Sequence, residues 1–404
     1  MKNKEVLIND YFKALSNEIA IDIIRYDTIR IAPEEMGFLP RPVNIRTKIS
    51  SLRLARSIAF LLKLFWLSGG ALIFYFVEMI KLTRFFTITR ISKEELSNCN
   101  TFLLAYSARA AQIIPTITSI QPDCIMTVPW EKVDVVGYKI SFFSLLSLKD
   151  AFYVLLLAIT SVYKFNLTTD REWILQTYTA FRWFSIRVAI NKIKGEFFIA
   201  EHFDRWAVLT DCYIESLILE SYEQSKLQLI QHGILKDIEM KGQKIILPYR
   251  LKNVSKLWVY DEYSKDYFIS FILDTLGNNF DVKYFSSNID LIEIDNNFKK
   301  SVMFIGHPAC ENFHINILSE MQKMGIYCIY KPHPKNASSK KVYMQDWFVV
   351  EQKDYFPKVD LLISYPSTLV QEYESQGIFA IVHSINAGEH EIKKYSGLVK
   401  EALS

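Results

Sequence analysis

Two short segments carry residue types that could bind a phosphate group. The first is Lys331-Pro332-His333-Pro334, which directly follows an apolar run. Its two prolines hold the backbone extended and disfavour helix at the residues before them. A lysine supplies a point charge suited to phosphate, and a histidine can donate a hydrogen bond to it. We therefore predict phosphate contacts from Lys331 and His333, with an ordinary solvated turn as the alternative.

The second segment, residues 364–368, reads Ser-Tyr-Pro-Ser-Thr and opens a predicted helix. A helix N-terminus presents unpaired N–H groups and a partial positive charge, so Ser367 and Thr368 predict a second phosphate contact. Glu372 lies one turn later on the same helix face, where it could accept hydrogen bonds from ribose hydroxyls. N-capping by Ser367 and a solvated Glu372 are the simpler alternatives.

Other apolar runs end in residues that could transfer a proton. His232 follows one such run, and its ionisation near neutral pH suits general acid or base catalysis. Glu201 and Asp204 follow another run as candidate bases or nucleophiles, although Asp204 could simply cap the helix after it. His307, after a further run, is a weaker candidate.

The candidate segments lie in parts of the chain where short apolar runs alternate with amphipathic stretches. Residues 195–286 and 301–383 both show this rhythm, which predicts strands and helices in a parallel sheet. Ligands of such sheets bind beyond the carboxyl ends of the strands, which is where the candidates fall. No Gly-x-Gly-x-x-Gly follows a predicted strand, so the dinucleotide fingerprint is absent. The predicted fold class is α/β.

The domain organisation follows from the same patterns. Residues 1–190 are rich in apolar positions at helical spacing, with a strand predicted at 124–128. A polar, acidic stretch at 287–300 resembles an interdomain linker. We predict an N-terminal domain of residues 1–290, helix-rich over 1–190 and Rossmann-like over 195–286. Residues 291–404 form the predicted C-terminal domain.

Composition excludes several classes of protein. The 47 basic and 44 acidic side chains give a net charge of +3, which argues against a nucleic-acid binder. The five cysteines have no paired spacing, and no Asp-x-Asp follows a predicted strand, so we expect neither disulfides nor a metal. Residues 1–15 lack the pattern of a secretory signal, and the expected location is the cytoplasm.

One segment raises the question of a membrane. Residues 64–77 carry no charge but are fewer than the about 20 apolar residues that a span needs, and Gly69-Gly70 interrupts them. A buried core helix is one interpretation. The other is a peripheral contact with the inner face of the plasma membrane, because basic residues flank the segment. They are Arg46, Lys48, Arg53, Arg56, Lys63, Lys81, Arg84 and Arg90.

The order of the two phosphate motifs resembles the C-terminal half of bacterial GT-B glycosyltransferases. It is most similar to families that build surface polysaccharides from CMP-activated sugars: sialyltransferases, polysialyltransferases and Kdo transferases. The resemblance implies two Rossmann-like domains with a cleft between them and a helix-rich N-terminal extension. It also implies transfer of a sialic acid or Kdo-type sugar from a CMP donor to a surface polysaccharide or lipid-linked glycan. No metal and no cofactor besides the donor nucleotide is implied.

On this resemblance, Lys331 and His333 contact the phosphate or ribose of CMP, Ser367 and Thr368 hold the phosphate, and Glu372 holds the ribose. His307 belongs to the same nucleotide site.

The sequence offers more than one candidate for the catalytic base. The sialyltransferases use an acidic tripeptide that is absent here, which leaves Glu201, Asp204 and His232 as alternatives. The order of the motifs is also similar to that of the CDP-glycerol glycerophosphotransferases, which have a His-Gly turn in their N-terminal half. On this resemblance, His232-Gly233 would be that turn. A non-catalytic, membrane-associated protein of polysaccharide assembly is the third alternative.

Overall fold

The candidate residues follow strands of two separate parallel sheets. The structure is a computed structural model that describes residues 4–46, 48–49, 51–85, 96, 98–117, 121–133, 135–222, 225–232, 245–276, 280–285, 289–294, 300–333, 337–352, 355–385 and 387–404. The described residues up to His232, together with 245–285, form one compact unit, which we call unit 1. Those from Ile289 onward form unit 2.

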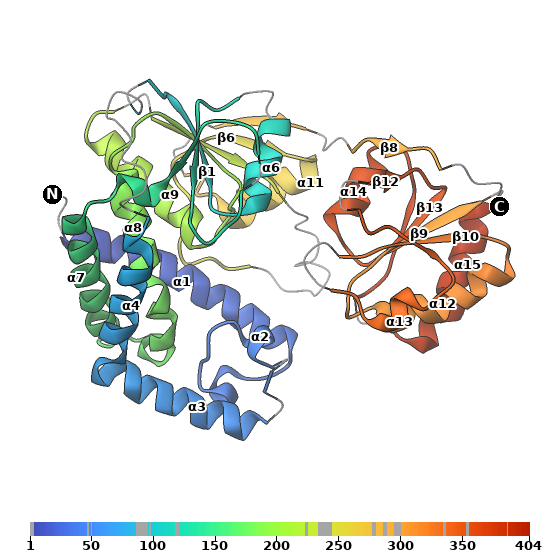
Figure 1. Ribbon diagram of the computed structural model, residues 1–404, viewed down its shortest axis with the longest axis horizontal. Helices are drawn as coiled ribbons and strands as arrows, with labels where there is room; N and C mark the ends of the chain where they lie inside the picture. The colour runs from blue at the N-terminus through green and yellow to red at the C-terminus, as the bar shows by residue number, and fades with distance from the viewer. Residues whose placement is uncertain are drawn as a thin grey trace. The chain divides into compact units, whose positions relative to one another are not determined.

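Unit 1 contains a seven-stranded parallel sheet in the order β3-β2-β1-β4-β5-β6-β7 (Figure 1). The strands are β1 (Thr101–Ala105), β2 (Cys124–Thr127), β3 (Lys139–Ser141), β4 (Glu196–Ile199), β5 (Lys226–Ile230), β6 (Val254–Val259) and β7 (Asp281–Tyr284). The chain adds strands in one direction up to β3 and in the other from β4. The switch point, where ligands of such sheets bind, therefore lies between β1 and β4.

This sheet begins earlier in the chain than the sequence predicts. Strands β1, β2 and β3 precede residue 195, where the Rossmann-like segment was expected to begin; only β2 was anticipated. Strand β1 is a short run of five residues, four of them buried. Periodicity cannot distinguish such a run from part of a buried helix, which is why β1 was missed.

Helices cover both faces of this sheet and form a further layer beside it (Figure 1). Helix α6 packs on one face, and α9, α8 and α1 lie beyond the other. The helices of unit 1 are α1 (Lys4–Thr28), α2 (Pro42–Arg46), α3 (Leu52–Phe65), α4 (Ala71–Thr83), α6 (Ala108–Ile117), α7 (Leu148–Phe165), α8 (Ala180–Ile190), α9 (Arg205–Leu219) and α11 (Glu262–Tyr267). The prediction of many helices before residue 190 is confirmed.

Unit 2 contains a five-stranded parallel sheet in the order β11-β10-β9-β13-β14. Its strands are β9 (Ser301–Ile305), β10 (Tyr327–Lys331), β11 (Phe348–Val349), β13 (Leu361–Ser364) and β14 (Ala380–Val382). Its helices are α12 (Glu311–Lys323), α13 (Lys340–Tyr343), α14 (Thr368–Glu374) and α15 (Ile392–Leu403), and β8 (Leu291–Ile292) pairs with β12 (Phe356–Pro357). The switch point lies between β9 and β13.

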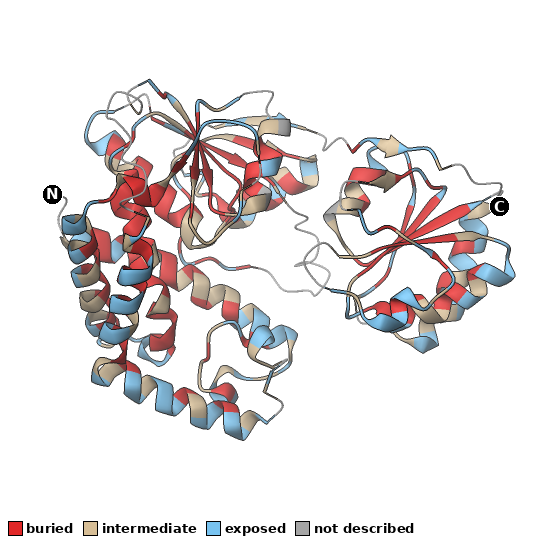
Figure 2. Cartoon of the chain, viewed as in Figure 1, coloured by how far each residue is buried: buried red, intermediate tan, exposed pale blue. Residues whose placement is uncertain are grey.

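The core of unit 2 is divided by its sheet into two layers. Along β9, Val302 and Phe304 pack with α12 and α15, whereas Met303 and Ile305 pack with α14 on the other face. All five residues of β9 are buried, as Figure 2 shows for the centre of this sheet. A strand buried on both faces reads as a continuous apolar run, and this is why the sequence predicts the strands of this unit well.

A buried asparagine fastens α1 to the loops at the sheet edge of unit 1. Asn17 is fully buried, and its Nδ2 donates to the carbonyl oxygens of Phe203, at 3.0 Å, and Tyr249, at 2.9 Å. Its Oδ1 accepts from the main-chain N–H of Tyr249 at 2.9 Å. One side chain therefore satisfies three main-chain groups from two distant segments.

We predict that Asn17→Ala lowers the free energy of unfolding by about 3 kcal/mol, because buried main-chain groups lose their partners. Urea denaturation followed by circular dichroism measures the change. The matched control is Asn312→Ala, at an exposed position on α12. Equal stability of the two variants would contradict this role of Asn17.

Candidate functional site

Glu201 lies at the switch point of the unit 1 sheet, two residues beyond the end of β4. Its carboxyl group is buried and hydrogen-bonded to the Ser107 hydroxyl, which comes from the end of the neighbouring strand β1. Ser107 Oγ also accepts from the N–H of Ala110, at 3.2 Å, in the first turn of α6. The second carboxyl oxygen of Glu201 has no hydrogen-bond partner among the described residues.

The environment of Glu201 favours its neutral form. Burial raises its pKa to about 8, and the nearby Asp204 carboxyl acts in the same direction. Removing a carboxylate from water disfavours the charged form, so this group is largely protonated at neutral pH. A carboxyl with a pKa close to the working pH can both accept and return a proton, which is what general acid–base catalysis requires.

Asp204 has a structural role in the same loop. It is the N-cap of α9, and its Oδ1 accepts from the N–H groups of Trp206, at 2.9 Å, and Ala207, at 3.1 Å. Burial and the charge of Glu18 raise its pKa. The capping alternative is therefore present in the structure, and it makes Asp204 a weaker candidate for the base than Glu201.

His232, at the end of β5, forms a pair with His202. The main-chain N–H of His232 donates to His202 Nε2 at 3.1 Å, so the neutral His202 ring carries its proton on Nδ1. The His232 ring contacts the Ala200 carbonyl through Nδ1, which lies 3.2 Å from His202 Nε2. Burial and the second imidazole lower the pKa of His202. No role for His202 was predicted from the sequence, although it adjoins Glu201 in the chain.

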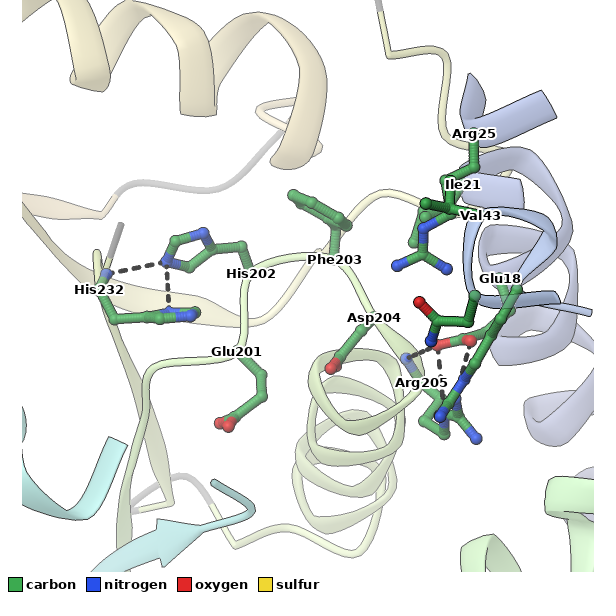
Figure 3. Close-up of a pocket in the computed structure, with 12 residues that line it drawn as sticks. Glu18, Ile21, Arg25, Val43, Glu201, His202, Phe203, Asp204, Arg205 and His232 are labelled. Carbon is green, nitrogen blue, oxygen red and sulfur yellow. Dashed lines mark hydrogen bonds and ion pairs between the residues drawn. The ribbon is translucent and has the colours of Figure 1, made fainter. Parts of the chain in front are cut away.

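These side chains open on a cavity of about 630 Å³ within unit 1, which is large enough for a sugar or a nucleotide-sized ligand. Figure 3 shows the histidine pair and Glu201 on strand-end loops, opposite residues of α1. The lining residues are Glu18, Ile21, Arg25, Arg41, Val43, Asn44, Glu201, His202, Phe203, Asp204, Arg205 and His232.

Three arginines give this cavity its charge. Arg205 forms a two-pronged ion pair with Glu18, at 3.1 and 2.9 Å, and Arg25 pairs with Asp22 at 2.8 Å. Arg41 is the third lining arginine. Because Glu18 pairs with Arg205 and Asp22 pairs with Arg25, only part of the positive charge of the arginines is available to a ligand. No sequence motif predicts a role for Arg25 and Arg41, because nothing near them in the chain marks them as neighbours of residues 201–232.

A second cluster lies at the switch point of the unit 2 sheet. His307 follows β9, His333 follows β10 and Tyr365 follows β13. The His307 ring centroid lies 5.4 Å from that of His333 and 5.2 Å from that of Tyr365. A Cβ on Gly306 would lie 2.2 Å from Tyr330 Oη, so only glycine allows this close approach. The structure thus brings His307 and His333, both predicted from sequence, into one group.

His307 is neutral and oriented in this cluster. Its Nδ1 accepts from the N–H of Ala309 at 3.2 Å, so the neutral ring carries its proton on Nε2. Partial burial lowers its pKa. An imidazole N–H of this kind can donate to a phosphate oxygen.

Ser367 occupies the N-cap position of α14 without capping it. Its backbone is extended, but its side chain makes no capping hydrogen bond, and its buried Oγ has no partner among the described residues. One turn later, Gln371 Oε1 is likewise buried without a described partner. The capping alternative for Ser367 is therefore wrong. The side chain of Thr368 lies outside the described residues.

Lys331 and Glu372 differ from their expected surroundings. Lys331 is the buried last residue of β10, and its Nζ donates to the carbonyls of Gln352, at 3.2 Å, and Tyr355, at 2.8 Å. These bonds favour a structural role over the predicted phosphate contact. Glu372 is buried, so the alternative of a solvated side chain is wrong.

Cys310, His314 and His383 form the one cluster of potential metal ligands found among the described residues. However, His314 Nε2 and His383 Nε2 lie 2.7 Å apart, which is hydrogen-bond distance. Two nitrogens bound to one tetrahedral zinc at about 2.0–2.1 Å each lie farther apart than this. His383 Nδ1 also lies 2.8 Å from the Ser384 carbonyl oxygen. The arrangement is a buried chain of neutral hydrogen bonds rather than a built metal centre.

Comparison of the chain with family models and with curated proteins gives no match to either. The candidate sites therefore depend on geometry and chemistry alone.

We predict that Glu201→Gln changes the pH dependence of stability. The folded protein keeps a proton on Glu201 up to about pH 8, whereas the unfolded chain has already released it at neutral pH. The wild type therefore loses about 1–2 kcal/mol of stability relative to the variant as the pH rises from 6.5 to 8. Thermal melts across this range measure the difference. Glu220→Gln, at the exposed end of α9, is the control; parallel curves for wild type and Glu201→Gln would contradict the prediction.

Proposed function

We propose that the protein is a metal-independent glycosyltransferase that uses a nucleotide-activated sugar. The observation that carries this proposal is the buried carboxyl group of Glu201, a residue that lies at a switch point and is among the residues lining an arginine-containing cavity. In the proposal, unit 1 binds the acceptor glycan and supplies the base, and unit 2 binds the donor nucleotide. The two parallel sheets are consistent with a GT-B arrangement.

The unit 2 cluster suits the leaving phosphate. His307 and His333 can donate imidazole N–H groups, and the partnerless Ser367 hydroxyl can donate a further hydrogen bond. Donors already oriented in a partly buried site stabilise developing phosphate charge without reorganisation. The resemblance of the motif order to CMP-sugar transferases favours CMP as the nucleotide and a sialic acid or Kdo-type sugar as the group transferred.

The proposed reaction is a single displacement. Glu201, in its ionised form, takes the proton of the acceptor hydroxyl as the acceptor oxygen bonds to the anomeric carbon. The bond from that carbon to the phosphate oxygen breaks, and the nucleotide leaves with the electron pair. Because the pKa of Glu201 is about 8, the ionised fraction and the rate should rise from pH 6 towards pH 8.

We propose an acceptor that carries negative charge. Arg25, Arg41 and Arg205 can contact carboxylate or phosphate groups on a growing surface polysaccharide or a lipid-linked glycan. Nucleotide-activated sugars are cytoplasmic substrates, so the proposed location is the cytoplasm, at its boundary with the membrane.

Two other functions compete with this one. Transfer of glycerol phosphate from CDP-glycerol would use the same phosphate cluster, with His232 beside the reacting groups. A non-catalytic protein of polysaccharide assembly would keep the fold and bind no nucleotide. A panel of CMP-sugars and CDP-glycerol distinguishes the first from our proposal, and calorimetry with CMP, CDP, UDP and GDP distinguishes the second.

We predict that Glu201→Gln lowers sugar transfer about 100-fold or more and removes its rise between pH 6 and pH 8, because the amide cannot accept the proton. Product formation from a CMP-sugar donor measures both effects, with Glu220→Gln as the control at an exposed site. Transfer at the wild-type rate by Glu201→Gln would leave His232 and Asp204 as the remaining bases.

We predict that His333→Ala and Ser367→Ala each weaken CMP binding about tenfold, which corresponds to one lost hydrogen bond to a charged group. Isothermal calorimetry measures this, and His390→Ala, which alters an exposed histidine of the same unit, should bind as the wild type does. Unchanged affinity in both site variants would remove the nucleotide from this cluster.

A further inference from the structure

Helices α3 and α4 turn large apolar side chains outward. Figure 2 shows exposed residues along both helices. The exposed apolar side chains are Leu54, Phe60, Leu61, Leu62, Leu64, Phe65, Leu72, Ile73, Phe76, Val77 and Ile80. Helix α7, which packs against α4, adds Leu148, Phe152 and Leu156 at a spacing of four residues. Contiguous apolar surface of this extent marks an interaction site.

This segment is neither a core helix nor a straight membrane span. Among the described residues, Leu52–Thr83 is the one helical stretch long and apolar enough to cross a membrane by length and composition, and only 22% of its most apolar window is buried. It bends at Gly69, whose φ of 121° lies outside the helical range. The two arms have 14 and 13 residues, each shorter than the about 20 that a span needs.

The inner side of the segment is fixed to unit 1 by polar contacts. Trp66 Nε1 donates to Thr177 Oγ1 at 2.9 Å, and the Tyr75 hydroxyl donates to the Thr177 carbonyl at 2.6 Å. Glu78 forms a 2.7 Å ion pair with Arg182. These contacts hold α4 and the bend before it against the protein and leave the apolar side chains on the outside.

Exposed basic side chains lie at both ends of this segment, whereas the exposed Glu34 and Glu35 lie in the turn Pro33–Met36 that packs against α3. Arg53 and Arg56 are exposed at the start of α3, and Lys81 and Arg84 are exposed at the end of α4. Glu78 is the single acidic residue of 52–83, and it is buried in its ion pair. If two copies of this chain paired through this segment, the basic residues at its ends would face each other whether the segments ran parallel or antiparallel. Anionic lipid headgroups complement them, while the acyl boundary receives the apolar side chains.

We propose that the outer face of α3 and α4 docks on an anionic lipid bilayer without spanning it. The proposal does not rest on the proposed catalytic function, because it uses none of the residues of either candidate site. Docking would hold the unit 1 cavity at a bilayer surface, where a lipid-linked glycan is presented.

Sedimentation with vesicles tests this proposal on the full chain. We expect the wild type to sediment with vesicles of equal phosphatidylglycerol and phosphatidylcholine, much less with pure phosphatidylcholine, and less as salt is raised. The double variant Leu61→Gln/Ile73→Gln, at side chains 63% and 59% exposed, should bind at least about tenfold more weakly. Arg53→Gln/Arg56→Gln should reduce binding to the anionic vesicles alone.

The control is Leu219→Gln/Leu276→Gln, which removes apolar side chains that are 81% and 90% exposed elsewhere in unit 1. It should bind as the wild type does. Three results would overturn the proposal: absence of vesicle binding, equal loss in the control, or a wild-type dimer in solution that Leu61→Gln/Ile73→Gln abolishes. Light scattering detects the dimer, and circular dichroism checks that every variant is folded.

Discussion

The hydrogen bonds of Asn17 to the main chains of Phe203 and Tyr249 are the constraint on which the unit 1 site depends. They hold α1 against the loop that follows β4, and the same helix supplies Glu18 and Arg25 to the cavity wall. The same loop carries Glu201, whose pKa is raised by burial. A contact between residues 186 positions apart in the chain thus fixes the helix that forms one wall of the cavity.

The two units use the same architecture for different chemistry. Each is a parallel sheet whose strand order reverses once, and each places its candidate residues beyond the strands at the reversal and the strand next to them, β5 in unit 1 and β10 in unit 2. At this position unit 1 has a buried carboxyl group and a histidine pair, which suit proton transfer. Unit 2 has His307 and His333 beside the buried Ser367 hydroxyl, which suit a phosphate. In the proposed transfer, unit 1 would supply the base and unit 2 would hold the leaving phosphate.

The helices of unit 1 show two opposite uses of polarity. Helix α1 buries Asp10, Asn17 and Asp22. Each contacts another segment, namely Arg187, the main chain of Tyr249 and the side chain of Gln176, and these contacts orient the helix on the protein. Helices α3 and α4 do the reverse, because their polar contacts face inward and their leucines and phenylalanines face outward. Burying a polar group is costly unless the group has a hydrogen-bond or ion-pair partner. A large apolar patch that faces outward from the protein marks a surface that another molecule covers, and for α3 and α4 we propose that this is a lipid bilayer.

Most of the strands that carry candidate residues could be predicted from sequence, because buried parallel strands are continuous apolar runs separated by amphipathic helices. The positions of Glu201, His232, His307, His333 and Ser367 at strand or helix ends followed from that rhythm. Only the tertiary structure decided that 101–105 is a strand, that His202 pairs with His232, and that Lys331 is held by main-chain carbonyls. It also decided that Arg25 and Arg41 line the cavity. The local spacing of apolar residues indicates whether a segment is a helix or a strand and which of its residues are buried. The direction of a side chain and the identity of its neighbours depend instead on packing between segments far apart in the chain.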